Sequence, residues 1–283
     1  MATRTHASKD LFGSSKNASP TIRVGIGGWT FEPWRKNFYP EGLVQRRELE
    51  YASRHVTSIE INGTFYGAQK PATYKKWAEE TPEHFMFSLK APRYVMAAKS
   101  LGDAGRGVDG FVFGGLAEMG DRLGPILWQL PPTRRFDADD IARFMDLLPA
   151  ELEGRPMRHV LETRHESFMC EAYIALARKH RVATVFTDSP DYPSYADVTG
   201  DFVYARLMRS RSGQKHGYPA AELNTWAKRA REWADGGDPA DLPHVAAPLP
   251  NGKPREVFIY FISAAKEHNP AAAMALIERL GSR

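Results

Sequence analysis

Short apolar runs alternate with amphipathic stretches along the chain from residue 22 onward. The runs are rich in Val, Ile and Phe, whose branched and aromatic side chains favour β-strands. Each run has the length of a single strand, and most of the stretches between them are long enough to hold a helix. The eight predicted strands cover residues 22–28, 56–62, 85–90, 125–130, 159–164, 182–188, 202–207 and 256–261.

The stretches between the strands have helical patterns. The predicted helices cover residues 43–55, 73–80, 137–148, 171–181, 220–234 and 270–280. Eight strands alternating with helices over about 260 residues predict a TIM (β/α)8 barrel, with a doubly wound open sheet as the alternative. We expect one α/β domain over residues 21–283. The small polar residues of segment 1–20 indicate a disordered tail.

Loops that follow strands lie at the C-terminal end of a barrel, where barrel enzymes carry their active sites. Residues 91–115 and 208–219 are such loops, and the second is the better candidate for ligand contact. Residues 235–255, rich in Pro and Gly, join a helix to a strand and are expected at the opposite end. The segment "GIGG" at 25–28 lacks the spacing of a dinucleotide loop, so no nicotinamide or flavin motif is present.

Period-two alternation assigns every second residue of a barrel strand to the interior. This places a set of polar side chains inside, toward the C-terminal ends of their strands. They are Ser58, Glu60, Asn62, Ser88, Lys90, Gln129, Glu162, Arg164, Thr184, Asp188, Tyr204 and Arg206. Three of them are carboxylates and three are cations, which are costly to bury unless they are paired. We expect a polar ligand site; the alternative is an ion-pair network that only fixes the strand register.

Three chemistries are compatible with this ring. Acid–base catalysis would use Glu60, Glu162 or Lys90 with a shifted pKa. A divalent metal would use the oxygens of Glu60, Glu162 and Asp188 for Mg²⁺ or Mn²⁺, or add His165 for Zn²⁺, so the cofactor stays open. Anion binding is favoured, because Arg offers a bidentate fork and the loop after the seventh strand is a common phosphate seat. Its cations are Lys90, Arg164, Arg206, Arg209 and Arg211.

Aromatic residues gather in the first two loops after strands. They would stack on a sugar or base, or form a satellite core that holds long loops. They are Trp29, Trp34, Phe38, Tyr39, Phe65 and Tyr66. His165 and His216 also lie in loops after strands, where they are either proton carriers or ordinary loop histidines.

Composition narrows the class of partner only slightly. The net charge of +4 mildly favours anionic ligands and is too small to indicate nucleic acid. No apolar run approaches the roughly 18 residues that span a membrane, and the start of the chain lacks the apolar part of a secretory signal. The single Cys170 fits a reducing, cytoplasmic setting. The oligomeric state is open.

Ordered motifs along most of the chain resemble a known family. They are "GIGGWTFEPWRKNFYP", "EINGTFYG", "TYKKWAEETPEHFMFSLKAPR", "LGPILWQLPP", "LETRHESF", "TDSPDYP" and "FVYARL". In order and spacing they resemble the YecE-like family, the domain of unknown function numbered 72. The resemblance implies a TIM barrel with a site at the strand C-termini, and it implies no reaction. The motif residues are Trp29, Glu60, Asn62, Thr64, Phe65, Tyr66, Lys90, Gln129, Glu162, Arg164, His165, Asp188 and Arg206.

The sequence departs from the family pattern at several positions. Gly27 and Gly63 stand where Ser is common, and Met208 stands where His is frequent. The segment "FISAAKEHN" replaces an Asn-rich turn after the last strand. If the missing His and Asn belong to the site, these changes alter the substrate or impair activity.

The sequence therefore predicts a protein that binds an anionic, phosphorylated small molecule at the C-terminal rim of the barrel. If the protein is an enzyme, this molecule is its substrate. Glu60 or Glu162 would be the acid or base and Lys90 an electrostatic stabiliser, while Arg164 and Arg206 clamp the anion. One alternative is a nucleic-acid-binding or metal-dependent repair or phosphodiesterase-type protein that uses the basic stretch 206–215. The other is a non-catalytic interaction protein.

Overall fold

Eight parallel strands close into a barrel in the computed structural model, which describes residues 22–249 and 252–281. The strands are β1 (Ile22–Gly27), β2 (Ser58–Ile61), β3 (Met86–Lys90), β4 (Leu123–Gln129), β7 (His159–Glu162), β8 (Ala183–Thr187), β9 (Phe202–Leu207) and β10 (Glu256–Phe261). They follow one another around the barrel in chain order, and β10 closes it by pairing in parallel with β1. The predicted TIM barrel and each of its eight strands are confirmed.

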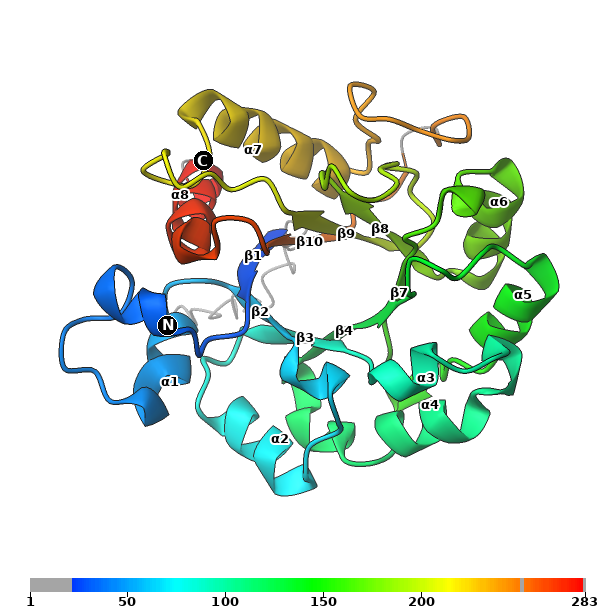
Figure 1. Ribbon diagram of the computed structural model, residues 1–283, viewed down its shortest axis with the longest axis horizontal. Helices are drawn as coiled ribbons and strands as arrows, with labels where there is room; N and C mark the ends of the chain where they lie inside the picture. The colour runs from blue at the N-terminus through cyan, green and yellow to red at the C-terminus, as the bar shows by residue number, and fades with distance from the viewer. Residues whose placement is uncertain (1–21, 250–251, 282–283) are drawn as a thin grey trace, which may run out of the picture.

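The helices form an outer ring around the barrel (Figure 1). They are α1 (Glu48–Ala52), α2 (Pro71–Glu79), α3 (Arg93–Met96), α4 (Gly105–Val112), α5 (Ala138–Asp146), α6 (Glu171–His180), α7 (Ala220–Ala234) and α8 (Asn269–Gly281). Segment 91–115, expected as a loop, holds α3 and α4. Glycines hid the apolar spacing of Val108, Phe111 and Val112, which are fully buried.

Short elements connect these parts. The 3-10 helices are η1 (Glu32–Lys36), η2 (Gln45–Arg47), η3 (Gly63–Phe65), η4 (Leu101–Asp103), η5 (Leu116–Arg122), η6 (Glu166–Phe168) and η7 (Lys266–His268). A separate antiparallel pair, β5 (Glu151–Leu152) and β6 (Arg155–Pro156), precedes β7. Across residues 22–249 and 252–281, no helix is both long and apolar enough to cross a membrane. The tail expected at 1–20 lies outside the described residues.

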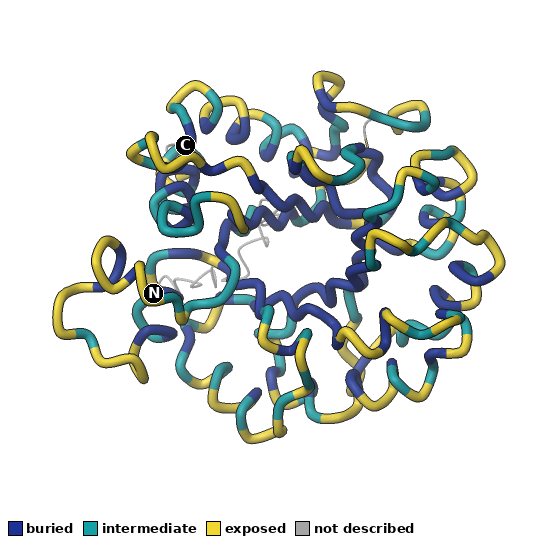
Figure 2. Tube along the Cα trace, in the orientation of Figure 1, coloured by how far each residue is buried: buried dark blue, intermediate teal, exposed yellow. Residues whose placement is uncertain are grey.

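The barrel wall is buried on both sides, whereas exposure concentrates in the outer helices and loops (Figure 2). The larger apolar cluster, which includes Ile59 and Phe87, packs the wall against the helices. A second cluster fills the interior and includes Leu127, Val160 and Phe258. Alternation along the strands thus creates two separate packed layers.

The predicted orientation of β8 is wrong by one residue. Val185 belongs to the interior cluster, whereas Thr184 points to the helix layer and its hydroxyl lies 3.0 Å from that of Tyr173 on α6. The sequence Ala-Thr-Val-Phe-Thr is compatible with burial on both faces, and all five residues are buried. Without a polar face, a strand gives no signal for its phase.

Candidate functional site

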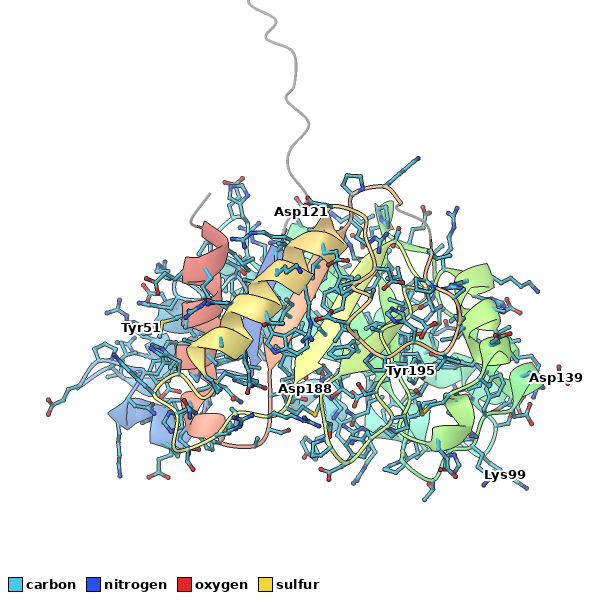
Figure 3. The ribbon with its side chains drawn as sticks, turned by 90° about the horizontal axis from the view of Figure 1, so that it is seen from above. Tyr51, Lys99, Asp121, Asp139, Asp188 and Tyr195 are labelled. Atoms are coloured by element: carbon cyan, nitrogen blue, oxygen red, sulfur yellow. The ribbon has the colours of Figure 1, made fainter. Side chains whose placement is uncertain are left out.

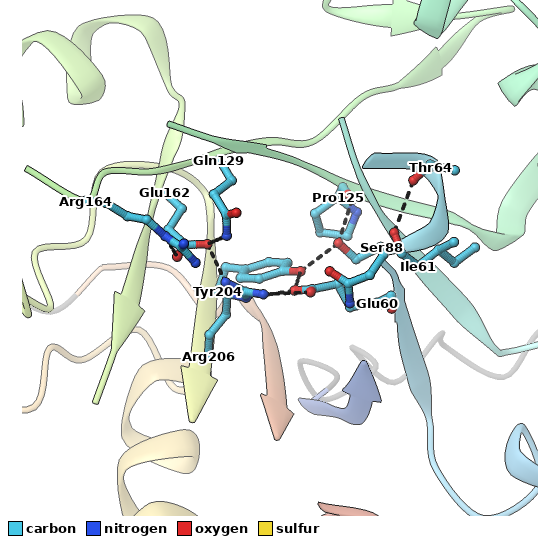
Figure 4. Close-up of polar contacts among 11 residues, drawn as sticks. Glu60, Ile61, Thr64, Ser88, Pro125, Gln129, Glu162, Arg164, Tyr204 and Arg206 are labelled. Atoms are coloured by element: carbon cyan, nitrogen blue, oxygen red, sulfur yellow. Dashed lines mark hydrogen bonds and ion pairs between the residues drawn. The ribbon is translucent and has the colours of Figure 1, made fainter. Parts of the chain in front are cut away.

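Arg206 on β9 is the centre of a buried charged cluster (Figure 4). Its Nε and Nη2 donate to the two carboxylate oxygens of Glu60 on β2, both at 3.0 Å. Its Nη1 donates to Glu162 Oε2 on β7 at 2.5 Å. Arg206 is 2% exposed and the two glutamates are no more exposed than that. One guanidinium therefore joins carboxylates from two distant strands, bonding Glu60 in the bidentate geometry that makes such pairs strong and Glu162 through one bond.

Tyrosines and serines extend this network into the barrel. The Tyr204 hydroxyl donates to Glu60 Oε2 at 2.8 Å and lies 2.7 Å from Ser88 Oγ. The Ser58 hydroxyl lies 2.7 Å from that of Tyr260 on β10. Burial raises the pKa of Tyr204 well above its ordinary value, so this hydroxyl stays protonated and donates to Glu60. The carboxylate of Glu60 thus accepts hydrogen bonds from both Arg206 and Tyr204, which lie on the same strand.

Glu162 is surrounded by donors. Besides Arg206, it accepts hydrogen bonds of 2.8 Å from Gln129 Nε2 on β4 and from Arg164 Nε after β7. Burial alone would raise its pKa, but Arg206, Arg164 and Gln129 outweigh burial and hold the pKa below its ordinary value. Glu162 therefore stays ionised near neutral pH and does not supply a proton there.

Lys90 is the last residue of β3 and lies beside this network. Arg206 and Arg164 form ion pairs there, whereas Lys90 forms none with any described residue. It is 9% exposed, and its Nζ lies 4.0 Å from the centre of the Phe65 ring. The Thr64 hydroxyl donates to the Lys90 carbonyl at 2.7 Å and so fixes η3 against β3. Burial, followed by the charge of Arg206, lowers the pKa of Lys90 to about 8 although Glu60 and Glu162 oppose this.

The cluster carries a surplus of positive charge. Two carboxylates face the cations Arg206, Arg164 and Lys90, which leaves a net charge of +1 when all five are ionised. Arg164 stacks on Tyr192 at 4.1 Å, with 16% of its side chain exposed. We call these five residues the charged ring. Arg206 is committed to the glutamates, so Lys90 and Arg164 are the cations that remain for a ligand.

Asp188 does not join the charged ring, and its predicted inward orientation is wrong. It follows β8 on the same side as Phe186, which packs against Trp226 of α7. Its carboxylate accepts hydrogen bonds from the Met208 backbone N–H at 2.5 Å and the Tyr218 hydroxyl at 3.3 Å. Figure 3 shows Asp188 beside α7, toward the opposite end of the barrel from Asp121. The misplacement follows from the same shift of phase as for Thr184.

Asp188 instead lines a separate pocket of about 440 Å³ together with the exposed Arg209 and with Arg211. Burial raises the pKa of Asp188 to about 6, although the Met208 N–H and the charge of Arg209 oppose this. Arg211 pairs with Glu222 at 2.9 Å. The predicted set of anion-binding cations is therefore divided between two places.

The ligands predicted for a metal do not converge. His165 Nδ1 accepts the backbone N–H of Ser167 at 3.1 Å and caps η6, and Asp188 faces away from the barrel interior. Among the residues that the structure describes, no three His, Cys, Asp or Glu side chains are grouped as a metal site requires. Glu60 and Glu162 are engaged by Arg206, so the donors that are present do not fit a divalent ion.

The aromatic residues of the first loop form a satellite core. Trp34, Phe38 and Tyr39 are buried. Trp29 packs edge-on against Trp77 of α2, with ring centres 5.2 Å apart, so it is not directed into the charged ring. In the second loop, Phe65 contacts Lys90, whereas Tyr66 is 81% exposed.

Other predicted residues have local roles. Asn62 Nδ2 donates to the main-chain carbonyl of Glu60 at 3.4 Å, a local bond that does not involve the side chains of the charged ring. Tyr192 and Tyr260 were not among the predicted site residues. Tyr260 lies two residues after Phe258 on β10 and on the same interior face, so period-two alternation could have placed it inside the barrel. Tyr192 lies in an irregular loop, where no periodicity places a side chain.

The fold is a TIM barrel, and the charged ring lies at the C-terminal ends of its strands. The profile of the family described as "Protein of unknown function DUF72" matches residues 23–283, and the chain belongs to this family. This confirms the resemblance inferred from the motifs.

Individual relatives agree with the family assignment. UPF0759 protein YecE of Escherichia coli K12 is 28% identical over 153 residues, which are 53% of this chain and 51% of that protein. UPF0759 protein YunF of Bacillus subtilis 168 is 33% identical over 70 residues, which are 25% of this chain and 24% of that protein. The chain thus spans about half the length of the curated YecE relative that it matches.

A solved structure agrees with the barrel. A DUF72 family protein from Thermotoga maritima superposes with a TM-score of 0.70 at 20% identity, over 92% of this chain and 98% of that one. At this level of identity the likeness shows the fold.

Proposed function

We propose that this chain binds a small anion, with a phosphate or carboxylate group, at the charged ring, and that it carries out acid–base chemistry there. The observation that carries the proposal is the uncompensated charge of Lys90 at the end of a barrel strand. Taking a cation out of water is costly unless an opposite charge compensates it. Both carboxylates of the ring are already bonded to Arg206, so an anion from outside is the natural counterion.

In this proposal the ring residues divide the work. Lys90 and Arg164 contact the anion, Lys90 as a compact charge and Arg164 through the part of its guanidinium that does not bond Glu162. A pKa of about 8 lets Lys90 hold or release a proton near neutral pH. Glu60 and Glu162 keep Arg206 in place, so Lys90 is the residue of the ring that exchanges protons.

Nucleic acid is the alternative partner, through the basic stretch 206–215. It receives less support, because Arg206 is buried in the charged ring and Arg211 is paired with Glu222. The two proposals differ in salt dependence. The affinity for DNA would fall steeply as the salt concentration rises, in proportion to the number of phosphate contacts. The affinity for one enclosed anion would change little with salt.

Calorimetric titration with inorganic phosphate, glycerol phosphate and small carboxylates tests the proposal. Lys90→Met and Arg164→Met each remove a charge-assisted contact, and we expect about tenfold weaker binding or more. Lys75→Met is the matched control, because Lys75 is an exposed lysine of α2 and its loss changes the net charge equally. Equal binding by all four proteins, or no binding of any of these anions to the unmodified chain, would overturn the proposal.

A further inference from the structure

We propose that Lys90 is an amine nucleophile that forms an imine with a small aldehyde or ketone carrying a carboxylate or phosphate group. The inference rests on the proposed anion site and adds to it a reaction and a substrate class. In this reaction Arg164 alone holds the anionic group of the substrate, and Lys90 reacts as the neutral amine instead of contacting the anion. It comes from the unusual surroundings of one amine at the end of β3.

A lysine attacks carbonyl carbon only as the neutral amine, which an adjacent carboxylate would suppress by holding the ammonium form. The charged ring removes this obstacle. Glu60 and Glu162 are bonded to Arg206, and Lys90 has no ion pair among the described residues. Burial, followed by the charge of Arg206, outweighs the opposing charges of the two glutamates and lowers the pKa of Lys90 to about 8, so a fraction of the amine is neutral near neutral pH.

The backbone and one neighbour of the amine are held in position. The main-chain carbonyl of Lys90 accepts a hydrogen bond from Thr64, and the Phe65 ring lies 4.0 Å from Lys90 Nζ. Lys90 remains 9% exposed, so it is not sealed from a ligand. An amine beside an anion contact is the arrangement that brings a reacting carbonyl group and a nucleophile together.

Arg164 supplies the contact that selects the substrate. Its guanidinium is held by Glu162 and by Tyr192, and it adjoins Lys90 closely enough to lower that residue's pKa. A carboxylate or phosphate bound there would present a nearby carbonyl group to Lys90. Small 2-oxo acids and phosphorylated aldehydes or ketones have both groups within a few bonds.

The step is balanced without a further reactant. The Lys90 nitrogen bonds to the carbonyl carbon, and the carbonyl oxygen leaves as water with the two hydrogens of the amine. A C=N bond replaces the C=O bond, and nothing is oxidised or reduced. The proton released when the ammonium form becomes the amine passes to solvent, to which Lys90 remains 9% exposed; Glu162, whose pKa is held low by its three donors, does not take it.

Lys266 provides a matched comparison. Its Nζ lies 4.4 Å from the Phe31 ring, and burial lowers its pKa, as for Lys90. It lies in η7, away from Arg206 and Arg164, whose charges do not act on its pKa. If an aromatic neighbour and partial burial were enough to make a lysine form an imine, both Lys90 and Lys266 would react.

The experiment is trapping with sodium borohydride, which reduces an imine to a stable secondary amine. The intact protein is incubated with pyruvate or glyceraldehyde 3-phosphate, with acetone as the uncharged control, and mapped by peptide mass spectrometry. We expect an adduct on Lys90 that carries the mass of the carbonyl compound less one oxygen. Lys266→Met should retain the adduct on Lys90, Arg164→Met should lose most of it, and acetone should give none.

The outcomes separate this inference from the proposed function. If phosphate binds as expected but neither anionic carbonyl compound labels Lys90, the imine inference is wrong and anion binding stands. Labelling spread over surface lysines, and unchanged in Lys90→Met, also overturns it. If neither phosphate nor the carbonyl compounds bind, both proposals fail. Mapping the unmodified protein makes the test independent of whether the variants fold.

Discussion

Arg206 is the residue that permits two glutamates in the barrel interior. It bonds both, and all three side chains are nearly inaccessible to solvent. Removing one partner from a buried ion pair leaves charges without compensation, which costs more than the pair itself contributes.

Arg206→Met is therefore expected to lower the free energy of unfolding by about 3–5 kcal/mol. Urea denaturation at neutral pH measures this value. Arg209→Met is the control, since Arg209 is exposed, and a change within about 0.5 kcal/mol is expected there. A loss for Arg206→Met as small as that of the control would show that the ring is not held by this residue.

Lys90 gives anion binding a characteristic pH dependence. With a pKa of about 8, it is charged below that pH and neutral above it. The affinity for sulfate should therefore fall as the pH rises through about 8, because sulfate, unlike phosphate, keeps the same charge over this range. Lys90→Arg keeps its charge over this range and should bind sulfate with a flat profile. Calorimetry across this range decides; a flat profile for the unmodified chain would contradict the assignment of Lys90.

At the scale of elements, a buried histidine connects two strands: His159 begins β7 and contacts Trp128 of β4. His159 Nδ1 accepts the Trp128 indole N–H at 3.1 Å, and its Nε2–H donates to the Pro149 carbonyl at 2.8 Å. The ring is thus neutral, with no room for a second proton between it and Trp128. Burial lowers the pKa of His159 to about 4, although the bond to Pro149 opposes this.

This histidine makes stability depend on pH. The unfolded chain protonates His159 near its ordinary pKa of about 6.5, whereas the folded chain does not until about 4. The stabilisation that the neutral His159 contributes is complete above about 6.5 and is lost as the pH falls through this window, by up to about 3 kcal/mol. Asp188, whose pKa is raised to about 6, acts in the opposite direction over the same range, so the test is the difference between two proteins. In urea denaturation, the free energy of unfolding of the unmodified chain minus that of His159→Gln should decrease by this amount as the pH falls from about 6.5 to about 4. The same difference for His84→Gln, at an exposed site, should stay constant; a constant difference for His159→Gln would refute the assignment.

The strands show which parts of the site could be predicted. On β2, β3 and β9 polar and apolar residues alternate, so Glu60, Lys90 and Arg206 were correctly brought together from sequence. On β8 burial on both faces removed the contrast, and Asp188 was placed on the wrong side. His165 was misplaced for another reason, because a loop side chain that caps a turn follows no strand period.

For the whole molecule, the number and spacing of the apolar runs favoured a barrel over a doubly wound open sheet, and the structure shows the closed barrel. The distribution of charge inside it did not follow. Sequence predicted three carboxylates against three cations, and the fold leaves two against three. The surplus charge depends on the position of Asp188, which tertiary packing decides.

Anomalous diffraction from crystals soaked in selenate tests the central claim most directly, because selenate is a tetrahedral dianion that resembles phosphate. The account predicts a selenium peak in contact with Lys90 and Arg164, and its loss in crystals of Lys90→Met. Selenium peaks elsewhere on the molecule with none at these two residues, or a peak there that Lys90→Met leaves unchanged, would contradict it.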